Sequence, residues 1–128
     1  MRSQPVMTTK RLPAEGTKPA WRAVCPRSEL LPDVGTCVEL DSEQVAVFWL
    51  TVPDTLHAVS NCDPFGQANV ISRGIVGSLG GAPVVASPLY KQHFNLDTGV
   101  CIEDPGKSLA VFDVRVVDDQ VELRRRPA

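Results

Sequence analysis

The sequence predicts an all-β fold, a sandwich or barrel built from many short strands. Two observations lead to this prediction. Apolar residues come in short runs broken by turn signals, and no window of about a dozen residues shows the 3.6-residue period of an amphipathic helix. Proline makes up 11 of the 128 residues, which argues against long helices. With 43% hydrophobic and 22% charged residues, the chain has the composition of one globular domain.

The first half of the chain is expected to form four strands. Residues 1–20 carry three prolines and few apolar side chains, so we expect a flexible N-terminal segment before a domain over 21–126. A connector at 26–32 should contain one helical turn with Ser28 as its N-cap. The run 45–50 is apolar throughout, which indicates a central strand buried on both faces. The expected strands are 21–24, 36–40, 44–50 and 55–59.

The second half is expected to form two β-hairpins, the first of which lies inside an inserted segment. Around Asp118-Asp119, apolar and polar residues alternate with a period of two, which is typical of strands with one solvated face. Residues 61–106 hold turn sequences and should form a small inserted subdomain with two finger loops. The expected strands are 73–78, 82–86, 109–117 and 120–124. The turn sequences are Asp63-Pro64-Phe65-Gly66, Ser87-Pro88-Leu89-Tyr90 and 95–99.

Charge and cysteine content argue against several classes of protein. The net charge of −2 does not suit a surface built for nucleic acid, and no apolar run approaches the ~20 residues that cross a membrane. Because 1–5 begins no signal peptide, we expect a cytoplasmic protein with four reduced cysteines. Their spacing contains no zinc or redox motif. We expect Cys37 to be buried in a strand, Cys62 to be exposed in a turn and His57 to lie at the surface.

Four motifs in the second half of the chain carry a family resemblance. They are Asn61-Cys62-Asp63-Pro64-Phe65, Ile71-Ser72-Arg73-Gly74-Ile75-Val76-Gly77, Ala86-Ser87-Pro88-Leu89-Tyr90-Lys91-Gln92-His93-Phe94 and Asp97-Thr98-Gly99. Together they resemble the small subunit of bacterial assimilatory NAD(P)H-dependent nitrite reductase, and the resemblance covers about 21–123. That family is similar to Rieske iron–sulfur domains. The resemblance therefore implies a Rieske-like antiparallel β-sandwich or barrel with the inserted two-loop subdomain.

The resemblance also assigns four positions to the cluster site of a Rieske domain. Such domains hold a [2Fe-2S] cluster through two loops, Cys-x-His and Cys-x-x-His. The matching positions are Asp63 and Phe65 in the first loop, and Ser87 and Tyr90 in the second. Because Phe65 has no lone pair and both hydroxyls are neutral, we expect no cluster, no metal and no catalytic residue. Instead, Asp63 and Ser87 should form hydrogen bonds in their turns, and the rings of Phe65 and Tyr90 should be in or near contact.

The resemblance implies a non-catalytic subunit that docks on a large catalytic subunit. That partner would carry FAD, an iron–sulfur cluster and siroheme, and it would reduce nitrite to ammonium with electrons from NAD(P)H. The finger loops 61–74 and 87–99 are the expected docking face, because rigid loops on a β scaffold are common binding sites. The candidate contacts on this face are Arg73, Lys91, Phe65 and Tyr90.

Two other functions stay open from the sequence. One is a Rieske-type electron-transfer protein whose cluster has atypical ligands such as Cys62, His93 and Cys101, which the colour of the purified protein would reveal. The other is a stand-alone β-barrel binding module that uses the basic ends of the chain to bind nucleic acid or a small ligand. Salt-dependent binding to oligonucleotides would distinguish this module from a subunit.

Overall fold

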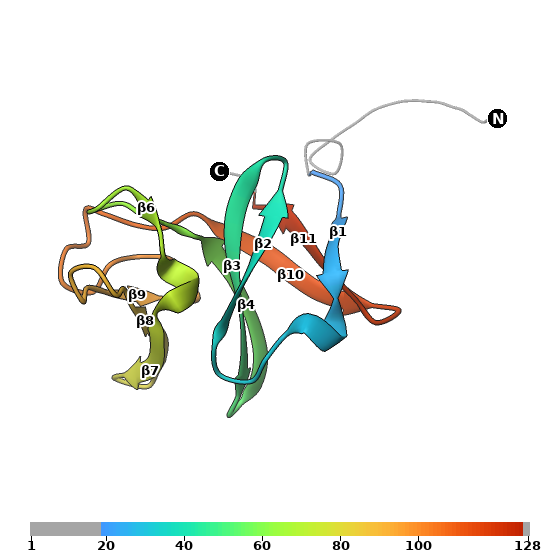
Figure 1. Ribbon diagram of the computed structural model, residues 1–128. Coiled ribbons are helices and arrows are strands. Elements are labelled where there is room, and N and C mark those ends of the chain that lie inside the picture. The colour runs from blue at the N-terminus through green and yellow to red at the C-terminus, as the bar shows by residue number, and fades with distance from the viewer. Residues whose placement is uncertain (1–18, 127–128) are drawn as a thin grey trace, which may run out of the picture.

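A six-stranded antiparallel sheet forms the larger part of the molecule (Figure 1). The computed structural model describes residues 19–126, so most of the expected flexible segment 1–20 lies outside the described residues. The strand order is β1-β11-β10-β4-β3-β2, and the sheet closes almost into a barrel. Its strands are β1 (Arg22–Pro26), β2 (Gly35–Leu40), β3 (Glu43–Thr51), β4 (Asp54–Ser60), β10 (Val111–Val117) and β11 (Gln120–Arg125). The predicted all-β fold is confirmed.

Residues 61–108, called the finger module below, connect β4 to β10 and lie beside the six-stranded sheet, at the left of Figure 1. They form a two-stranded and a three-stranded antiparallel sheet, the latter in the order β7-β8-β9. The elements are β5 (Cys62–Asp63), β6 (Ala68–Asn69), the 3₁₀ helix η2 (Ile71–Arg73), β7 (Ile75–Leu79), β8 (Ala82–Ala86) and β9 (His93–Asn95). The three short strands β5, β6 and β9 were not among the predicted strands.

The predicted helical turn in the first connector exists, but its predicted cap is wrong. The 3₁₀ helix η1 (Arg27–Glu29) has Pro26 at its N-cap position and no side-chain cap hydrogen bond. Ser28 lies inside this helix instead of before it. A 3₁₀ helix of one turn leaves few backbone donors to satisfy, so the fold forms it without a capping hydroxyl.

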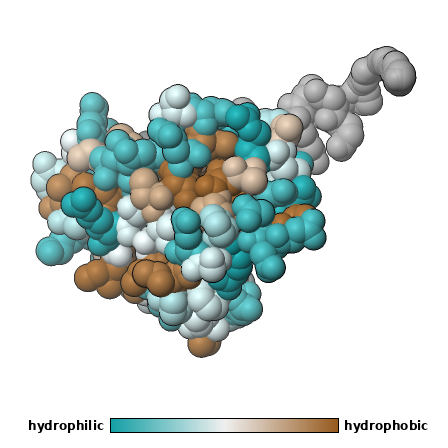
Figure 2. All heavy atoms as spheres, turned by 45° about the vertical axis from the view of Figure 1, so that its right-hand side comes forward, coloured by the Kyte–Doolittle hydropathy of each residue, from teal (hydrophilic) through white to brown (hydrophobic). Residues whose placement is uncertain are grey.

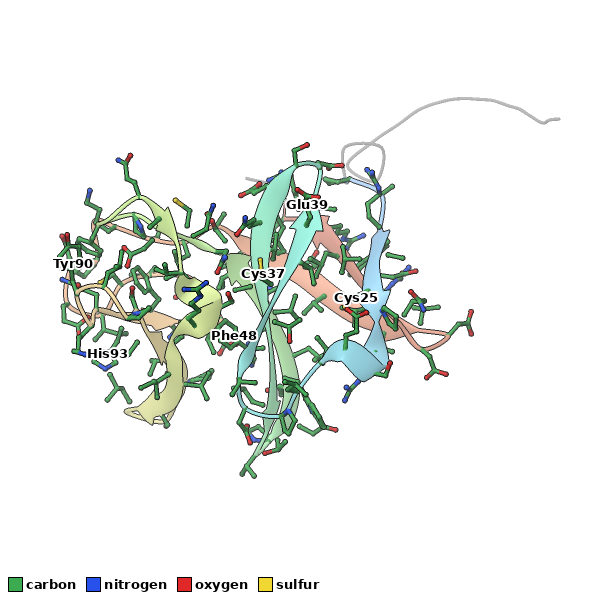
Figure 3. The ribbon with its side chains drawn as sticks, in the orientation of Figure 1. Cys25, Cys37, Glu39, Phe48, Tyr90 and His93 are labelled. Atoms are coloured by element: carbon green, nitrogen blue, oxygen red, sulfur yellow. The ribbon has the colours of Figure 1, made fainter. Side chains whose placement is uncertain are left out.

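Strand β3 supplies side chains to two hydrophobic cores, as the prediction of a strand buried on both faces requires. Successive side chains of a strand point to opposite faces. Val45 and Val47 accordingly lie in the core inside the six-stranded sheet. Ala46 and Phe48 lie in a second core, shared with the finger module (Figure 3). All four are fully buried. The second core therefore holds the finger module against the sheet.

A close backbone approach also fixes the finger module to the sheet. Helix η2 packs against β2 and β3. A Cβ atom added at Gly35 would overlap the backbone of Ser72, and it would lie 2.9 Å from the ring of Phe48. The sequence therefore needs glycine at this position, because any side chain would push η2 away from β2.

The prediction of a buried Cys37 is wrong. Val38 and Leu40 of β2 are buried, so the alternating side chains of Cys37 and Glu39 point to solvent (Figure 3). Cys62 is exposed, as predicted, and burial raises the pKa of the Cys25 thiol above its ordinary value. All four cysteines are free. Among residues 19–126, no helix has the length and apolar character that crossing a membrane requires.

Exposed apolar side chains gather at the lower edge of the molecule (Figure 2). They belong to the β3–β4 turn and to β7, which is an edge strand of its sheet. Val52 is 90% exposed, Ile75 is 78% exposed and Leu79 is 43% exposed. This apolar edge is a second exposed surface, separate from the finger loops that the sequence singled out.

Candidate functional site

Asp63 and Ser87 tie the two finger loops together. Both side chains are buried, with 0% and 1% of their surface exposed. The Ser87 hydroxyl donates a hydrogen bond to Asp63 Oδ2. Asp63 Oδ1 accepts hydrogen bonds from the backbone N–H groups of Phe65, at 2.7 Å, and Gly66, at 3.4 Å. The expected turn hydrogen bonds are therefore present, and the Asp63–Ser87 link adds a bridge between residues 24 positions apart.

The predicted contact between Phe65 and Tyr90 is wrong. The ring of Phe65 pairs with Phe94 instead, with the centroids 6.2 Å apart and the planes tilted by 52°. Tyr90 is 62% exposed and lies at the outer left end of the finger module in Figure 3. The reason is the β8–β9 pairing, which sets Phe94 opposite Val85 and turns its ring into the second core. Phe65 packs against that core, and Tyr90 does not.

The two loops meet through Leu89 and Gly66 instead of through two rings. A Cβ atom added at Gly66 would overlap the side chain of Leu89 and would lie 3.6 Å from the ring of Tyr90. The backbone N–H of Leu89 donates to the Ser87 hydroxyl at 3.3 Å. No sequence signal singled out Leu89 for this contact. Gly66 was recognised only as a turn residue, and its second role is to leave room for the opposite loop.

The predicted docking residues lie in different parts of the finger module. Lys91 is exposed and has a positive φ of 61° in the loop after β8, directly beside Tyr90. Arg73 is also exposed, but it ends η2, which packs against the six-stranded sheet. Lys107, which the sequence did not indicate, lies 5.8 Å from the centroid of the Phe65 ring. The outer end of the finger loops therefore presents an apolar and aromatic surface with two lysines.

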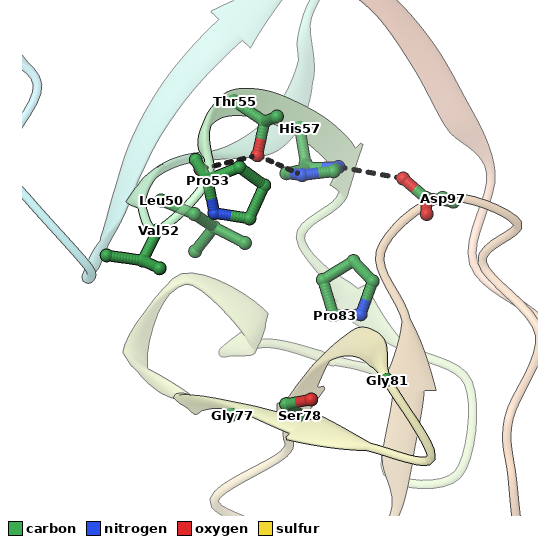
Figure 4. Close-up of a pocket in the computed structure, with 10 residues that line it drawn as sticks. All are labelled: Leu50, Val52, Pro53, Thr55, His57, Gly77, Ser78, Gly81, Pro83 and Asp97. Atoms are coloured by element: carbon green, nitrogen blue, oxygen red, sulfur yellow. Dashed lines mark hydrogen bonds and ion pairs between the residues drawn. The ribbon is translucent and has the colours of Figure 1, made fainter.

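A cavity of about 230 Å³ lies where the β3–β4 turn faces the β7–β8 hairpin (Figure 4). His57 lines it with its side chain only 10% exposed, so the prediction of a surface histidine is wrong. Its Nδ1 atom lies 3.2 Å from Asp97 Oδ1, and its Nε2 atom lies 3.0 Å from the Thr55 hydroxyl. The loop that carries Asp97 covers the ring. No local pattern around His57 could indicate this, because the covering loop comes much later in the chain.

We expect His57 to make the protein less stable in mild acid. Burial lowers the pKa of His57 below its ordinary value of about 6.5, and this effect outweighs Asp97, which raises it. The unfolded chain therefore binds the proton more readily than the folded chain. Stability should hold at neutral and higher pH and fall as the pH drops below about 6.5. The measurement is chemical denaturation from neutral pH to mild acid.

His57→Gln should remove this part of the pH dependence, because the glutamine side chain does not titrate. The matched control is His93→Gln, since His93 is the other histidine and pairs with Glu103 through a 2.6 Å contact. Loss of the pH dependence in His93→Gln, but not in His57→Gln, would contradict the prediction.

Comparison with known proteins shows the family of this chain. The family model for the Rieske-like [2Fe-2S] domain matches residues 20–124. The nitrite reductase (NADH) small subunit of Escherichia coli K12 is 42% identical over 104 residues, which are 81% of this chain and 96% of the relative. The chain belongs to the family of nitrite reductase small subunits. The predicted resemblance is confirmed.

The structure of a small subunit and the sequence of a large subunit extend this comparison. The NMR structure of the Escherichia coli protein NirD superposes with a TM-score of 0.76 at 41% identity, covering 84% of this chain and 98% of that one. The nitrite reductase [NAD(P)H] large subunit of Klebsiella oxytoca is 32% identical over 123 residues, which are 94% of this chain but 13% of the large subunit. A domain similar to this small subunit is thus part of that longer chain.

The residues at the finger loops of this small subunit do not fit the [2Fe-2S] cluster that the family name implies. Both oxygens of Asp63 accept hydrogen bonds, one of them from the Ser87 hydroxyl. Phe65 has no donor atom for a metal, and Tyr90 points outward. Within the described part of the chain, no group of three or more His, Cys, Asp or Glu side chains could hold a metal ion.

The alternative ligands Cys62, His93 and Cys101 belong to no metal-binding group among residues 19–126. His93 Nδ1 pairs with Glu103 Oε2 at 2.6 Å. Cys101 is buried, and burial raises the pKa of its thiol, which favours the neutral form over the thiolate that binds metals. Cys62 is exposed, and its thiol donates a 4.0 Å hydrogen bond to the backbone oxygen of Asp63 within its own loop.

Proposed function

We propose that this chain is the non-catalytic small subunit of an NAD(P)H-dependent nitrite reductase and that it docks on the large catalytic subunit. The observation that carries this function is the 42% identity to a nitrite reductase small subunit over 96% of that protein's length. A similar domain inside a large subunit supports a lasting association between the two. The large subunit would carry FAD, an iron–sulfur cluster and siroheme, and it would reduce nitrite to ammonium.

We further propose that residues 21–126 form one domain, whose inserted subdomain covers about 61–106. Within this subdomain we propose a role for four finger-loop residues. Asp63, Phe65, Ser87 and Tyr90 occupy the positions of former cluster ligands. The Asp63–Ser87 link then takes over the connection that a cluster makes between the loops. A cytoplasmic location of the complex is also proposed, and the four free cysteines support it.

The absence of a cluster is tested on the purified full-length chain. We expect a colourless, iron-free protein, because the loop residues offer no ligand set. The measurements are iron analysis and the visible absorption spectrum, before and after anaerobic incubation with ferrous iron and sulfide. About two iron atoms per chain with visible absorbance, the signature of a [2Fe-2S] centre, would contradict the prediction and favour the electron-transfer alternative.

Docking at the finger loops is tested by binding to the purified large subunit. Tyr90→Ala should weaken the complex about tenfold or more, because exposed tyrosines are frequent energetic anchors of interfaces. Its fold should be unaffected, since Tyr90 packs in neither core. Val117→Ala, at an exposed position on β10, is the matched control and should bind normally.

The same assay can contradict either part of the proposal. If Ile75→Ala weakens the complex and Tyr90→Ala does not, the docking face lies at the apolar edge around β7. If the wild-type chain forms no complex and does not change nitrite-dependent NAD(P)H oxidation by the large subunit, the proposed function is wrong.

A further inference from the structure

The basic side chains of the six-stranded sheet and of the finger module differ in their ion pairing. On the sheet, five arginines form ion pairs with carboxylates, at distances from 2.6 to 3.0 Å. These arginines are Arg22, Arg115, Arg124, Arg125 and Arg126. A sixth, Arg27, lies 4.2 Å from the centroid of the Trp49 ring. Five of these six arginines are therefore paired with carboxylates within the molecule.

The finger module has three cations, and none has a carboxylate partner among the described residues. They are Arg73, Lys91 and Lys107, and all three are exposed. The carboxylates of the module, in contrast, all contact a polar group inside this chain. Asp63 accepts from Ser87, Asp97 pairs with His57, Glu103 pairs with His93, and Asp104 accepts from the backbone of Gly106. The three cations of the module therefore lack an ion-pair partner among the described residues, whereas each carboxylate is held in place by a contact within the chain.

Two of the free cations flank the exposed apolar end of the finger loops. Lys91 directly follows Leu89 and Tyr90, which are 42% and 62% exposed. Lys107 comes from a different loop and lies over the ring of Phe65 at 5.8 Å. Protein interfaces commonly consist of an apolar or aromatic centre with charged groups at the rim. We call Leu89, Tyr90, Lys91 and Lys107 the finger tip.

The engaged carboxylates keep their orientation for a physical reason. Glu103 accepts a 2.8 Å hydrogen bond from the backbone N–H of His93, and this bond, together with the His93 ring, holds the pKa of Glu103 below its ordinary value. Its charge is thereby directed toward His93. The ammonium groups of Lys91 and Lys107 stand on long, flexible side chains with no such partner, so they can adapt to an opposing surface.

We propose that the finger tip binds an acidic patch with an apolar centre on the large subunit. This inference rests on the proposed function and adds the chemistry of the partner surface. The apolar pair Leu89 and Tyr90 supplies contact area, while Lys91 and Lys107 orient the two subunits and accelerate their encounter. The two exposed lysines of the finger tip decide the sign of the partner surface.

The test measures binding of the full-length chain to the purified large subunit at low salt and at about 0.5 M salt, where charges are screened within a few ångströms. We expect the wild-type dissociation constant to rise about tenfold or more over this range. The Lys91→Gln and Lys107→Gln double variant should bind about tenfold more weakly at low salt and lose most of the salt dependence. The reversed variant, Lys91→Glu with Lys107→Glu, should bind more weakly still.

Matched variants distinguish a failure of the acidic-patch inference from a failure of the proposed docking face. Arg22→Gln breaks an exposed ion pair on the sheet and should leave binding and its salt dependence unchanged. If Tyr90→Ala weakens the complex while the lysine variants and salt have no effect, the docking face holds and the acidic patch is wrong. If neither kind of variant weakens it, the docking face is wrong as well. Binding of the lysines to oligonucleotides instead of the large subunit would also overturn the inference.

Discussion

Replacing Asp63 with alanine should destabilise the protein by about 3 kcal/mol, because it leaves the Ser87 hydroxyl and two backbone N–H groups without their acceptor. A buried donor without a partner costs about 1–3 kcal/mol. Both Asp63 and Ser87 are almost fully buried, so water cannot easily replace the lost carboxylate. The measurement is urea denaturation followed by tryptophan fluorescence.

The loss of stability in Asp63→Ala should be concentrated at the finger loops. Amide hydrogen exchange should increase over 87–99 in Asp63→Ala, while β10 and β11 keep their protection. Asp63→Asn is the matched control, because its amide oxygen can still accept from the backbone of Phe65, and it should lose less stability than the alanine variant. If Asp63→Ala loses less than about 1 kcal/mol, the link is not what ties the two loops together.

Phe48→Ala should be the most damaging single substitution in the second core, with a loss of about 3–5 kcal/mol. Phe48 is fully buried between the six-stranded sheet and the finger module, and its ring lies close to Gly35. The cavity left behind would remove contacts on both sides at once. We expect hydrogen exchange to rise throughout the finger module, together with weaker binding to the large subunit.

Phe112→Ala is the matched control for this experiment. Phe112 is equally buried, but it belongs to the core inside the six-stranded sheet. The Phe112→Ala variant should lose a similar amount of stability. Its amides in the finger module should not lose protection from hydrogen exchange selectively. Equal loss of protection in the module for both variants would contradict the separate roles of the two cores.

The fold could be predicted because its strongest patterns are local. The continuous apolar run of β3 indicated a strand buried on both faces, and the alternating pattern around Asp118 indicated the final hairpin. The prediction that Cys37 is buried was wrong because the register between strands decides which side chains point into a core. The β2–β3 pairing sets Val38 opposite Val45 in the inner core and Cys37 opposite Ala46 on the other face, where the second core buries Ala46 but leaves Cys37 exposed.

The site was harder to predict, because its contacts join segments that are distant in the chain. Pro64 and Pro88 marked both loops, but no propensity indicates that Asp63 bonds to Ser87 across them. The partner of Phe65 is decided by the β8–β9 register, which favours Phe94 over the nearby Tyr90. His57 is buried by the loop around Asp97, and nothing in its own strand shows this.

The Asp63–Ser87 link also has a consequence for the order of folding. The link closes a loop of 24 residues that contains η2 and the β7–β8 hairpin. Closing that loop before η2 and the β7–β8 hairpin have formed would lower the entropy of the chain without gaining their contacts. The link should therefore form after the hairpin. Its loss should then accelerate unfolding and leave the refolding rate almost unchanged. The lifetime of the docking-competent finger loops would thus be set by a late-forming contact between two polar side chains.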